Sequence, residues 1–237
     1  MALSSNKENP YKKYLQNLPF SMEEIIPPSF PNFSLNIKDF GAVGDGKSLC
    51  SEAFKISIET LFKKGGGKLI VPSGVWLTGP IILKSNINLH LEIGAIIQFS
   101  EDEKLYSVFK TSFEGLETYR CQSPISAINE TNIAITGKGV IDGNWEFWRP
   151  VKKGKVTDSQ WENILKRPGG YLIKNNYWVP NKEYAKAETK ANMNVLLSSS
   201  EEDLNKYKRF LRPVMISLIK CKNILLQDII FHLQKIG

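Results

Sequence analysis

The feature that most constrains the fold of this chain is a short pattern in which an asparagine precedes an apolar run. The pattern occurs at Asn86-Ile-Asn-Leu89, Asn132-Ile-Ala-Ile135 and Asn223-Ile-Leu-Leu226. In the last two cases a second apolar run follows after a Gly or Asp step, at Gly139-Val-Ile-Asp142 and Asp228-Ile-Ile-Phe231. The first two asparagines lie 46 residues apart, which predicts two coils of about 23 residues each. Repeats of this length that pack only against their neighbours indicate a solenoid.

The strand-like runs between Lys68 and Phe99 decide which kind of solenoid is expected. They are short, rich in Ile, Leu and Val, and separated by turns such as Pro72-Ser-Gly74 and Gly79-Pro80. A β-sandwich or barrel would give similar spacing, but the asparagine repeat favours stacked coils. Because no helical period separates the runs, βαβ crossovers are not expected. We therefore predict an all-β fold: a right-handed, single-stranded parallel β-helix, of which this chain holds the N-terminal coils.

One helix precedes these strands and is expected to close the solenoid. It spans Ser51 to Lys64, with Ser51 as its N-cap, and Gly65-Gly-Gly67 ends it. Its apolar stripe recurs at helical spacing and consists of Phe54, Ile58, Leu61 and Phe62. Because the end of a solenoid exposes an apolar surface, we expect this helix to cover that end.

The remaining chain divides into an arm and an interrupted β-helix domain. Residues 1–35 contain five prolines, which exclude a long helix, and their phenylalanines predict an extended arm that lies on the body of the protein. Residues 36–237 are expected to form an incomplete parallel β-helix domain. Residues 144–210 break the strand pattern, which predicts a structured excursion with a short helix from Glu201 to Phe210.

Composition and charge narrow the classes of function. Apolar residues make up 42 % of the 237 and charged residues 23 %, as in globular proteins rather than disordered or coiled-coil chains. No apolar run approaches the roughly 20 residues that span a bilayer, and the N-terminus lacks the apolar region of a signal peptide. The formal net charge of +7 favours an anionic partner. Three scattered cysteines and two histidines argue against a structural zinc site, and we expect no metal and no cofactor.

A mixture of cations and aromatic residues gathers around the start of the excursion. The candidate substrate-binding residues are Arg120, Trp145, Trp148, Arg149 and Lys152. A cation suits the carboxylate of a sugar acid, and an aromatic ring suits the face of a pyranose. The same mixture suits single-stranded nucleic acid, or a surface excursion that packs its own aromatic side chains. The residues alone leave these three interpretations open.

Other polar residues in suggestive places are interpreted as structural. Asp45 and Asp142 precede glycines and are expected to cap turns. The charge run at residues 101–103 is typical of a solvated face. His90 lies between two leucines of a strand-like run, and we expect it to have a structural or solvated role.

Four segments together resemble glycoside hydrolase family 28, the polygalacturonase-like pectin hydrolases of the pectin-lyase-like superfamily. They are Asn36-Ile-Lys-Asp-Phe-Gly-Ala-Val-Gly-Asp-Gly46, Gly79-Pro-Ile-Ile-Leu83 with Asn88-Leu-His-Leu91, Ile135-Thr-Gly-Lys-Gly-Val-Ile-Asp-Gly143, and Leu211-Arg-Pro213 leading to Cys221-Lys-Asn-Ile-Leu225. The order and spacing match over about residues 11–231. The first segment is found across the superfamily, whereas the third is more specific to the hydrolases. The long excursion resembles that of bacterial members.

The resemblance implies a function, partners and a location. It implies hydrolysis of α-1,4-linked galacturonate in pectin with inversion, in which one carboxylic acid protonates the leaving oxygen and a second carboxylate activates water. It implies an acidic polysaccharide as partner, neither nucleic acid nor membrane insertion, a monomer at full length, and a secreted or periplasmic protein. A non-catalytic carbohydrate-binding β-helix and a pectate-lyase-like relative stay open as alternatives.

The chain departs from the family pattern after Phe231. The catalytic segments of the family are Asn-x-Asp, Asp-Asp, Gly-His-Gly and Arg-x-Lys, and none of them occurs in the 237 residues. We therefore carry over no catalytic residue. The abrupt change to His232-Leu-Gln-Lys-Ile-Gly237 predicts a chain that is truncated before the catalytic aspartates and is inactive by itself.

Overall fold

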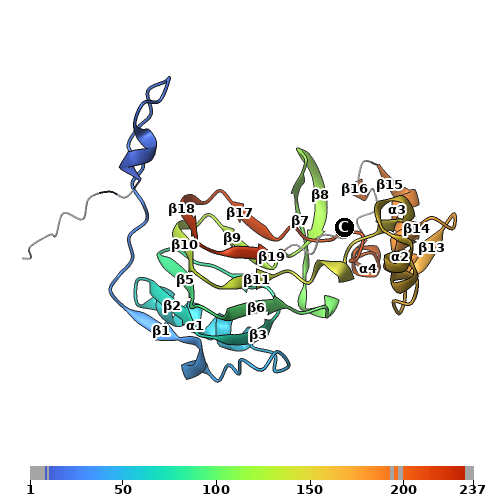
Figure 1. The fold of residues 1–237 in the computed structure, drawn as a ribbon, viewed down its shortest axis with the longest axis horizontal. Helices are drawn as coiled ribbons and strands as arrows, with labels where there is room; N and C mark the ends of the chain where they lie inside the picture. The colour runs from blue at the N-terminus through green and yellow to red at the C-terminus, as the bar shows by residue number, and fades with distance from the viewer. Residues whose placement is uncertain (1–8, 10, 193–194, 197–199, 233–237) are drawn as a thin grey trace, which may run out of the picture.

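Three parallel sheets wind around a common axis and form a stack of coils (Figure 1). The protein is described here from a computed structural model, which covers residues 9, 11–192, 195–196 and 200–232. Three successive coils each contribute one strand to each sheet, and all strands within these three sheets pair in parallel. The predicted parallel β-helix is therefore confirmed.

The strands of the three sheets follow one another along each coil. Sheet one consists of β1 (Ser34–Asn36), β2 (Gly67–Val71), β5 (Ile87–Leu91), β10 (Thr131–Gly137) and β18 (Lys222–Gln227). Sheet two consists of β3 (Gly74–Thr78), β6 (Ala95–Phe99), β11 (Val140–Asp142) and β19 (Ile230–His232). Sheet three consists of β4 (Ile81–Ile82), β9 (Ile125–Ile128) and β17 (Ile216–Ile219).

Asparagine side chains form a ladder along one corner of the stack, at the three positions that the sequence pattern marked. Asn132 Nδ2 donates to Asn86 Oδ1 at 3.0 Å, and Asn223 Nδ2 donates to Asn132 Oδ1 at 2.6 Å. All three residues have a positive φ, between 54° and 61°, a conformation that asparagine tolerates better than most residues. The pattern therefore reflects both the corner conformation and the ladder.

The prediction of two coils between Asn86 and Asn132 is wrong. Strand β5 pairs directly with β10, so the 46 residues between the two asparagines form a single coil. The extra length is the antiparallel hairpin of β7 (Val108–Phe113) and β8 (Leu116–Cys121), which leaves the coil and returns to it. The spacing of the asparagines does not show this, because an inserted hairpin lengthens one coil by about as many residues as a second coil would add.

The core of the solenoid is built from apolar side chains that stack in register. Leu69, Leu89 and Ile135 stand opposite one another in sheet one. Trp76 and Ile97 do so in sheet two, and all five side chains are fully buried. Burial of such stacks, at about 25 cal/mol per Å² of apolar surface, holds one coil to the next.

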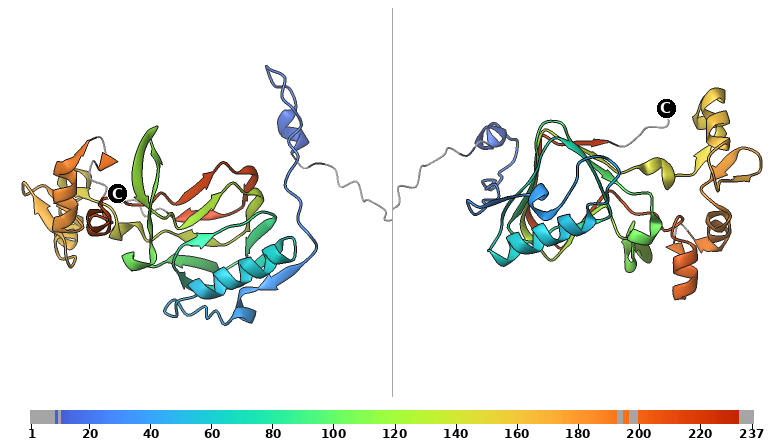
Figure 2. Two further views of the ribbon diagram at one scale, coloured as in Figure 1. Left: turned by 180° about the vertical axis from the view of Figure 1, so that it is seen from behind. Right: turned by 90° about the horizontal axis from the view of Figure 1, so that it is seen from below.

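Helix α1 (Ser51–Lys63) lies across the first coils and closes their end (Figure 2). Phe54, Ile58 and Leu61 are buried against the core, as expected. Phe62 is not, because 43 % of it is exposed on the outer side of the helix. Ser51 is also not the N-cap: Cys50 holds that position, and the Ser51 hydroxyl instead accepts a hydrogen bond from the Gly79 N–H at 2.7 Å. The helix is thereby tied to the turn before β4.

Two excursions leave the coils at the same corner, between sheet two and sheet three. The hairpin β7–β8, preceded by the 3-10 helix η3 (Glu103–Leu105), connects β6 to β9, and a longer excursion connects β11 to β17. The elements of the longer excursion are η4 (Trp145–Phe147), β12 (Val151–Lys152), η5 (Lys153–Lys155), α2 (Asp158–Leu165), β13 (Tyr171–Ile173), β14 (Tyr177–Val179), α3 (Lys182–Lys190), β15 (Ala191–Asn192), β16 (Val195–Leu196) and α4 (Glu201–Lys206). They pack around two apolar clusters, one of which also includes Tyr106 and Cys121 of the hairpin segment.

The segment before β1 contains η1 (Lys12–Leu15) and extends outward from the stack (Figure 1). After β1, the 3-10 helix η2 (Ile37–Phe40) leads into the first coil. Its Tyr11 hydroxyl donates to Gln227 Oε1 on β18 at 2.9 Å, and Phe33 packs against the core. Phe20, by contrast, is largely exposed. The division into an arm over residues 1–35 and a domain over residues 36–237 remains a prediction. No helix within the described ranges is long and apolar enough to cross a membrane.

Candidate binding pocket

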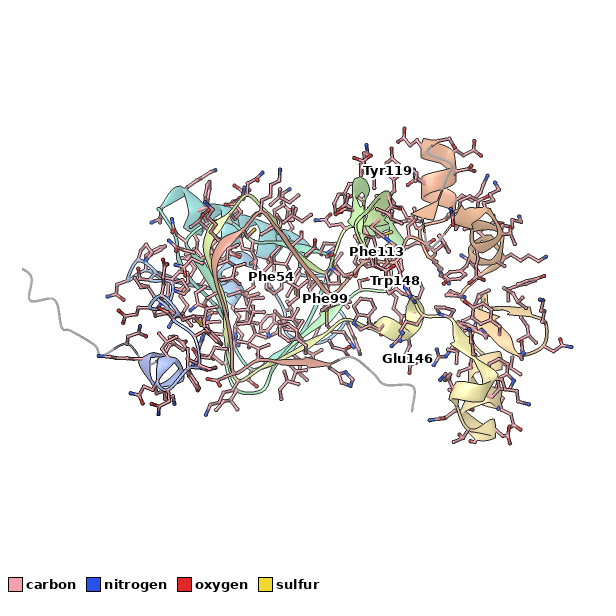
Figure 3. All side chains as sticks on the ribbon, turned by 90° about the horizontal axis from the view of Figure 1, so that it is seen from above. Phe54, Phe99, Phe113, Tyr119, Glu146 and Trp148 are labelled. Carbon is pink, nitrogen blue, oxygen red and sulfur yellow. The ribbon has the colours of Figure 1, made fainter. Side chains whose placement is uncertain are left out.

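The two excursions meet the segment that leads into β17, residues 212–215, and form a pocket there. Figure 3 shows Phe113 of the hairpin and Trp148 of the longer excursion at this junction, whereas Phe54 and Phe99 point into the interior of the coils. The pocket has a volume of about 370 Å³. It is lined by Phe113, Arg120, Trp145, Arg149, Tyr184, Phe210, Arg212, Pro213, Val214 and Met215.

Three arginines give the pocket its charge. Arg120, Arg149 and Arg212 come from the hairpin, from the start of the long excursion and from its end. Among the described residues that line the pocket, none is acidic. The enclosed space is therefore positive, and its low-dielectric walls strengthen its attraction for an anion.

Arg120 is held rigidly by the hairpin. It pairs with Phe109 across the two strands, and its guanidinium lies 3.9 Å from the centre of the Phe113 ring. Burial lowers the pKa of Arg120, and the positive charge of Arg212 lowers it further. Arginine keeps its proton at any ordinary pH. Arg120 is therefore a destabilised cation, and an anion that enters the pocket would stabilise it.

Trp145 forms one wall through a close approach to the backbone. Asp142 Oδ1 accepts a hydrogen bond from the Asn144 N–H at 3.0 Å, which makes the turn that the sequence predicted for Asp142. A Cβ at Gly143 would collide with the Trp145 indole and lie 2.9 Å from Met215 Cε. Glycine is therefore required at this point of the family-like segment. Trp145 Nε1 is buried and finds no hydrogen-bond acceptor among the described residues.

Two residues of the pocket escaped the sequence analysis. Tyr184 lies in α3, is buried, and has a hydroxyl pKa that burial raises, so it stays a neutral hydrogen-bond donor. Arg212 lies at the far end of the excursion, 92 residues after Arg120. The one signal that pointed to Arg212 was its place in Leu211-Arg-Pro213, a segment noted for its resemblance rather than for its charge.

The structure brings together three of the five predicted binding residues and separates the other two. Arg120, Trp145 and Arg149 line the pocket. Trp148 is 1 % exposed and packs edge-on against Tyr106 and Phe147 at 5.2 Å. Its ring therefore cannot meet a sugar, because it belongs to the core of the excursion. Lys152 lines a different groove.

The other polar residues have structural partners. Asp45 accepts backbone hydrogen bonds from Lys47 and Ser48 at 2.8 and 2.7 Å, which lower the pKa of its carboxyl to about 2. His90 Nδ1 lies 2.8 Å from Thr136 Oγ1. Glu103 departs from the expected solvated face, since it pairs with Arg209 at 3.1 Å. In the described part of the chain, no group of three or more His, Cys, Asp or Glu side chains is arranged to hold a metal ion.

Parts of the sequence are similar to those of known polygalacturonases. A probable polygalacturonase of Vitis vinifera is 37 % identical over 128 residues, which are 48 % of this chain and 25 % of that protein. The exo-poly-alpha-D-galacturonosidase of Dickeya chrysanthemi is 34 % identical over 118 residues, 46 % of this chain and 19 % of that enzyme. Over about half of its length, this chain is thus similar in sequence to polygalacturonases. No protein-family model matches it.

The structural likeness to polygalacturonases extends over most of the chain. A hyperthermoactive exopolygalacturonase from Thermotoga maritima superposes with a TM-score of 0.64 and 37 % sequence identity, covering 87 % of this chain and 43 % of that enzyme. The chain thus shares the right-handed parallel β-helix fold of these exopolygalacturonases. The chain spans less than half the length of each of these polygalacturonases.

Proposed function

We propose that this chain is part of a pectin-degrading glycoside hydrolase, and that its arginine pocket binds a carboxylate of polygalacturonate. The observation that carries the proposal is the set of three arginines around one pocket without an acidic lining residue among those described. Support comes from the names of the relatives, which are a probable polygalacturonase and an exo-poly-alpha-D-galacturonosidase.

The pocket offers a sugar acid a matching set of groups. A guanidinium presents parallel N–H donors that fit both oxygens of a carboxylate. Trp145 and Phe113 provide apolar faces for a pyranose ring. The Trp145 Nε1–H is buried beside Gly143, so Trp145 would offer a sugar the face of its ring rather than this donor. We assign carboxylate binding to Arg149 and Arg212, and orientation of the ring to Trp145.

We further propose that the pocket receives the end of a polygalacturonate chain. Two of the relatives are named as exo-acting enzymes. In this chain the hairpin and the long excursion rise from the same corner and wall the pocket on two sides. A wall across a binding groove favours a terminal sugar over an internal one, because an internal sugar needs an exit for its neighbours on both sides.

Replacement of Arg149 tests this assignment. Arg149→Ala is expected to weaken binding of digalacturonate about tenfold or more, because a charge-assisted hydrogen bond contributes about 1.5–3 kcal/mol. Arg149→Lys keeps the charge but loses the paired N–H donors of the guanidinium, so its affinity for digalacturonate should lie between those of the wild type and Arg149→Ala. Isothermal titration calorimetry measures all three. The matched ligand is the methyl ester of digalacturonate; equal affinity of the wild type for acid and ester would show that the pocket does not recognise a carboxylate.

We propose that the pocket binds substrate without cleaving it. Hydrolysis with inversion uses two carboxyl groups on opposite sides of the scissile bond, whereas this pocket presents cations. The 237-residue chain is therefore expected to release no reducing ends from polygalacturonate above background. A reducing-end assay at several enzyme concentrations checks this. Turnover that Asp142→Asn abolishes would contradict it, and would give the turn aspartate a chemical role.

The partners and location follow from the same proposal. Pectin is a polymer of plant cell walls, so we place the enzyme outside the cytoplasm, secreted or periplasmic. The substrate is an acidic polysaccharide rather than a nucleic acid, and we propose a monomer as the working form of the full enzyme.

A further inference from the structure

A second positive groove lies on the excursion, away from the arginine pocket. It is formed at the small antiparallel sheet β12–β14–β13 and borders α3. Its volume is about 590 Å³. It is lined by Lys152, Gly154, Lys155, Ile173, Lys174, Asn176, Tyr177 and Glu188. None of these residues lines the arginine pocket.

The lysines of this groove carry charge that the rest of the fold does not neutralise. Lys152, Lys155 and Lys174 are exposed, and none of them joins an ion pair within the part of the chain that the structure describes. The neighbouring Lys153 does, with Asp158 at 4.0 Å. The carboxylate of the groove, Glu188, accepts a hydrogen bond from the Tyr177 hydroxyl at 2.9 Å. Three lysines thus face one carboxylate that is already bonded.

Lys174 occupies a backbone position that does not suit lysine. Lys174 and Asn175 have φ values of 49° and 57° and form the turn between β13 and β14, which pair from Ile173 and Tyr177 outward. Tight hairpin turns with two consecutive positive φ angles favour asparagine and glycine. Asn175 fits this preference, and Lys174 does not. The turn between β13 and β14 therefore places the Lys174 side chain at the groove without requiring a lysine there, which makes Lys174 a suitable position for substitution.

Tyr177 supplies a fixed ring beside the lysines. It packs against the apolar cluster that contains Trp148 and Tyr184, and the Lys152 ammonium lies 5.9 Å from its ring centre. A half-buried ring with a cation beside it suits a sugar ring that carries a carboxylate. Single-stranded nucleic acid takes several stacking rings in succession, whereas this groove presents one.

We propose that this lysine groove, defined by Lys152, Lys155, Lys174 and Tyr177, is a second binding site for an acidic polysaccharide. It would hold a stretch of polymer while the arginine pocket holds a chain end. The choice of polygalacturonate as its ligand rests on the proposed function; the position and charge of the groove do not. The site would increase retention of the protein on the polymer without taking part in bond cleavage.

The Lys174→Asn variant separates binding from stability. Asparagine suits the turn better, so the melting temperature should stay equal or rise, while the dissociation constant for immobilised polygalacturonate should rise about threefold. Lys152→Ala combined with Lys174→Asn should raise it about tenfold. The matched control is Lys47→Asn, which removes one exposed lysine from the distant loop before α1. A higher melting temperature with unchanged binding, or an equal loss in Lys47→Asn, would overturn the proposal.

Ligand length distinguishes this proposal from the proposed function. Lys174→Asn should leave the binding of digalacturonate unchanged and weaken only that of the polymer, whereas Arg149→Ala should weaken both. If the polymer responds to Arg149→Ala alone, the lysine groove has no binding role and the pocket assignment stands. If the polymer responds to Lys174→Asn alone, the groove stands and the pocket assignment fails. Tighter binding to single-stranded oligothymidylate than to polygalacturonate would overturn the polysaccharide as ligand.

Discussion

Replacement of Gly137 by alanine is expected to remove about 4 kcal/mol or more of folding free energy, which is at the upper end for single substitutions. Gly137 ends β10 with a φ of +111°. A Cβ there would lie 2.8 Å from the Leu91 carbonyl carbon and closer still to its oxygen. That oxygen accepts the Lys138 N–H at 3.0 Å. Relief would therefore separate two paired strands of sheet one rather than turn a side chain.

Urea unfolding followed by circular dichroism measures this loss. The control is Gly115→Ala at the turn of the hairpin, where φ is +81° but no atom lies within 4 Å of the added Cβ. Its cost should be limited to the unfavourable backbone conformation, about 1–2 kcal/mol. Equal losses in the two variants would show that the close approach of β10 to β5 has no steric consequence.

Phe54→Ala should lower the free energy of unfolding by about 3–5 kcal/mol. Phe54 is 1 % exposed and packs between α1 and the first coils. Its removal leaves a cavity between α1 and the first coils, and the helix would have to shift to fill it. Thermal unfolding of the variant should also begin at lower temperature.

The comparison for Phe54→Ala comes from the same helix. Ile56→Ala removes a similar apolar side chain from the solvent side of α1, where 44 % of it is exposed, and should change stability by no more than about 0.5 kcal/mol. If both variants lose the same free energy, the loss in Phe54→Ala does not come from its burial against the solenoid end, because alanine favours the helix at both positions.

The fold was largely predictable because its corners leave a mark in the sequence. Asn86, Asn132 and Asn223 recur because each has to adopt a left-handed conformation and hydrogen-bond to the next. The number of coils was not predictable from their spacing. A spacing of 46 residues fits two short coils as well as one coil that carries the hairpin β7–β8, and the spacing alone does not distinguish them.

The candidate site was only half predictable for a related reason. Arg120, Trp145 and Arg149 were found by their residue types, but the same criterion selected Trp148, which is buried. Whether an aromatic side chain faces solvent or the core depends on the packing of the excursion, where Tyr106 approaches it from a distant segment. Arg212 and Tyr184 were missed because the chain returns to the pocket only after the excursion is complete.

The common departure point of the two excursions has a consequence for how such proteins diversify. The hairpin and the long excursion both begin after a strand of sheet two and end before a strand of sheet three, while the asparagine ladder and the stacked core lie elsewhere in each coil. Insertions at this corner can lengthen, shorten or change sequence without altering the register of the coils. Selection can therefore reshape the surface that meets the ligand over an unchanged framework, and relatives with different polymers need differ little outside that corner.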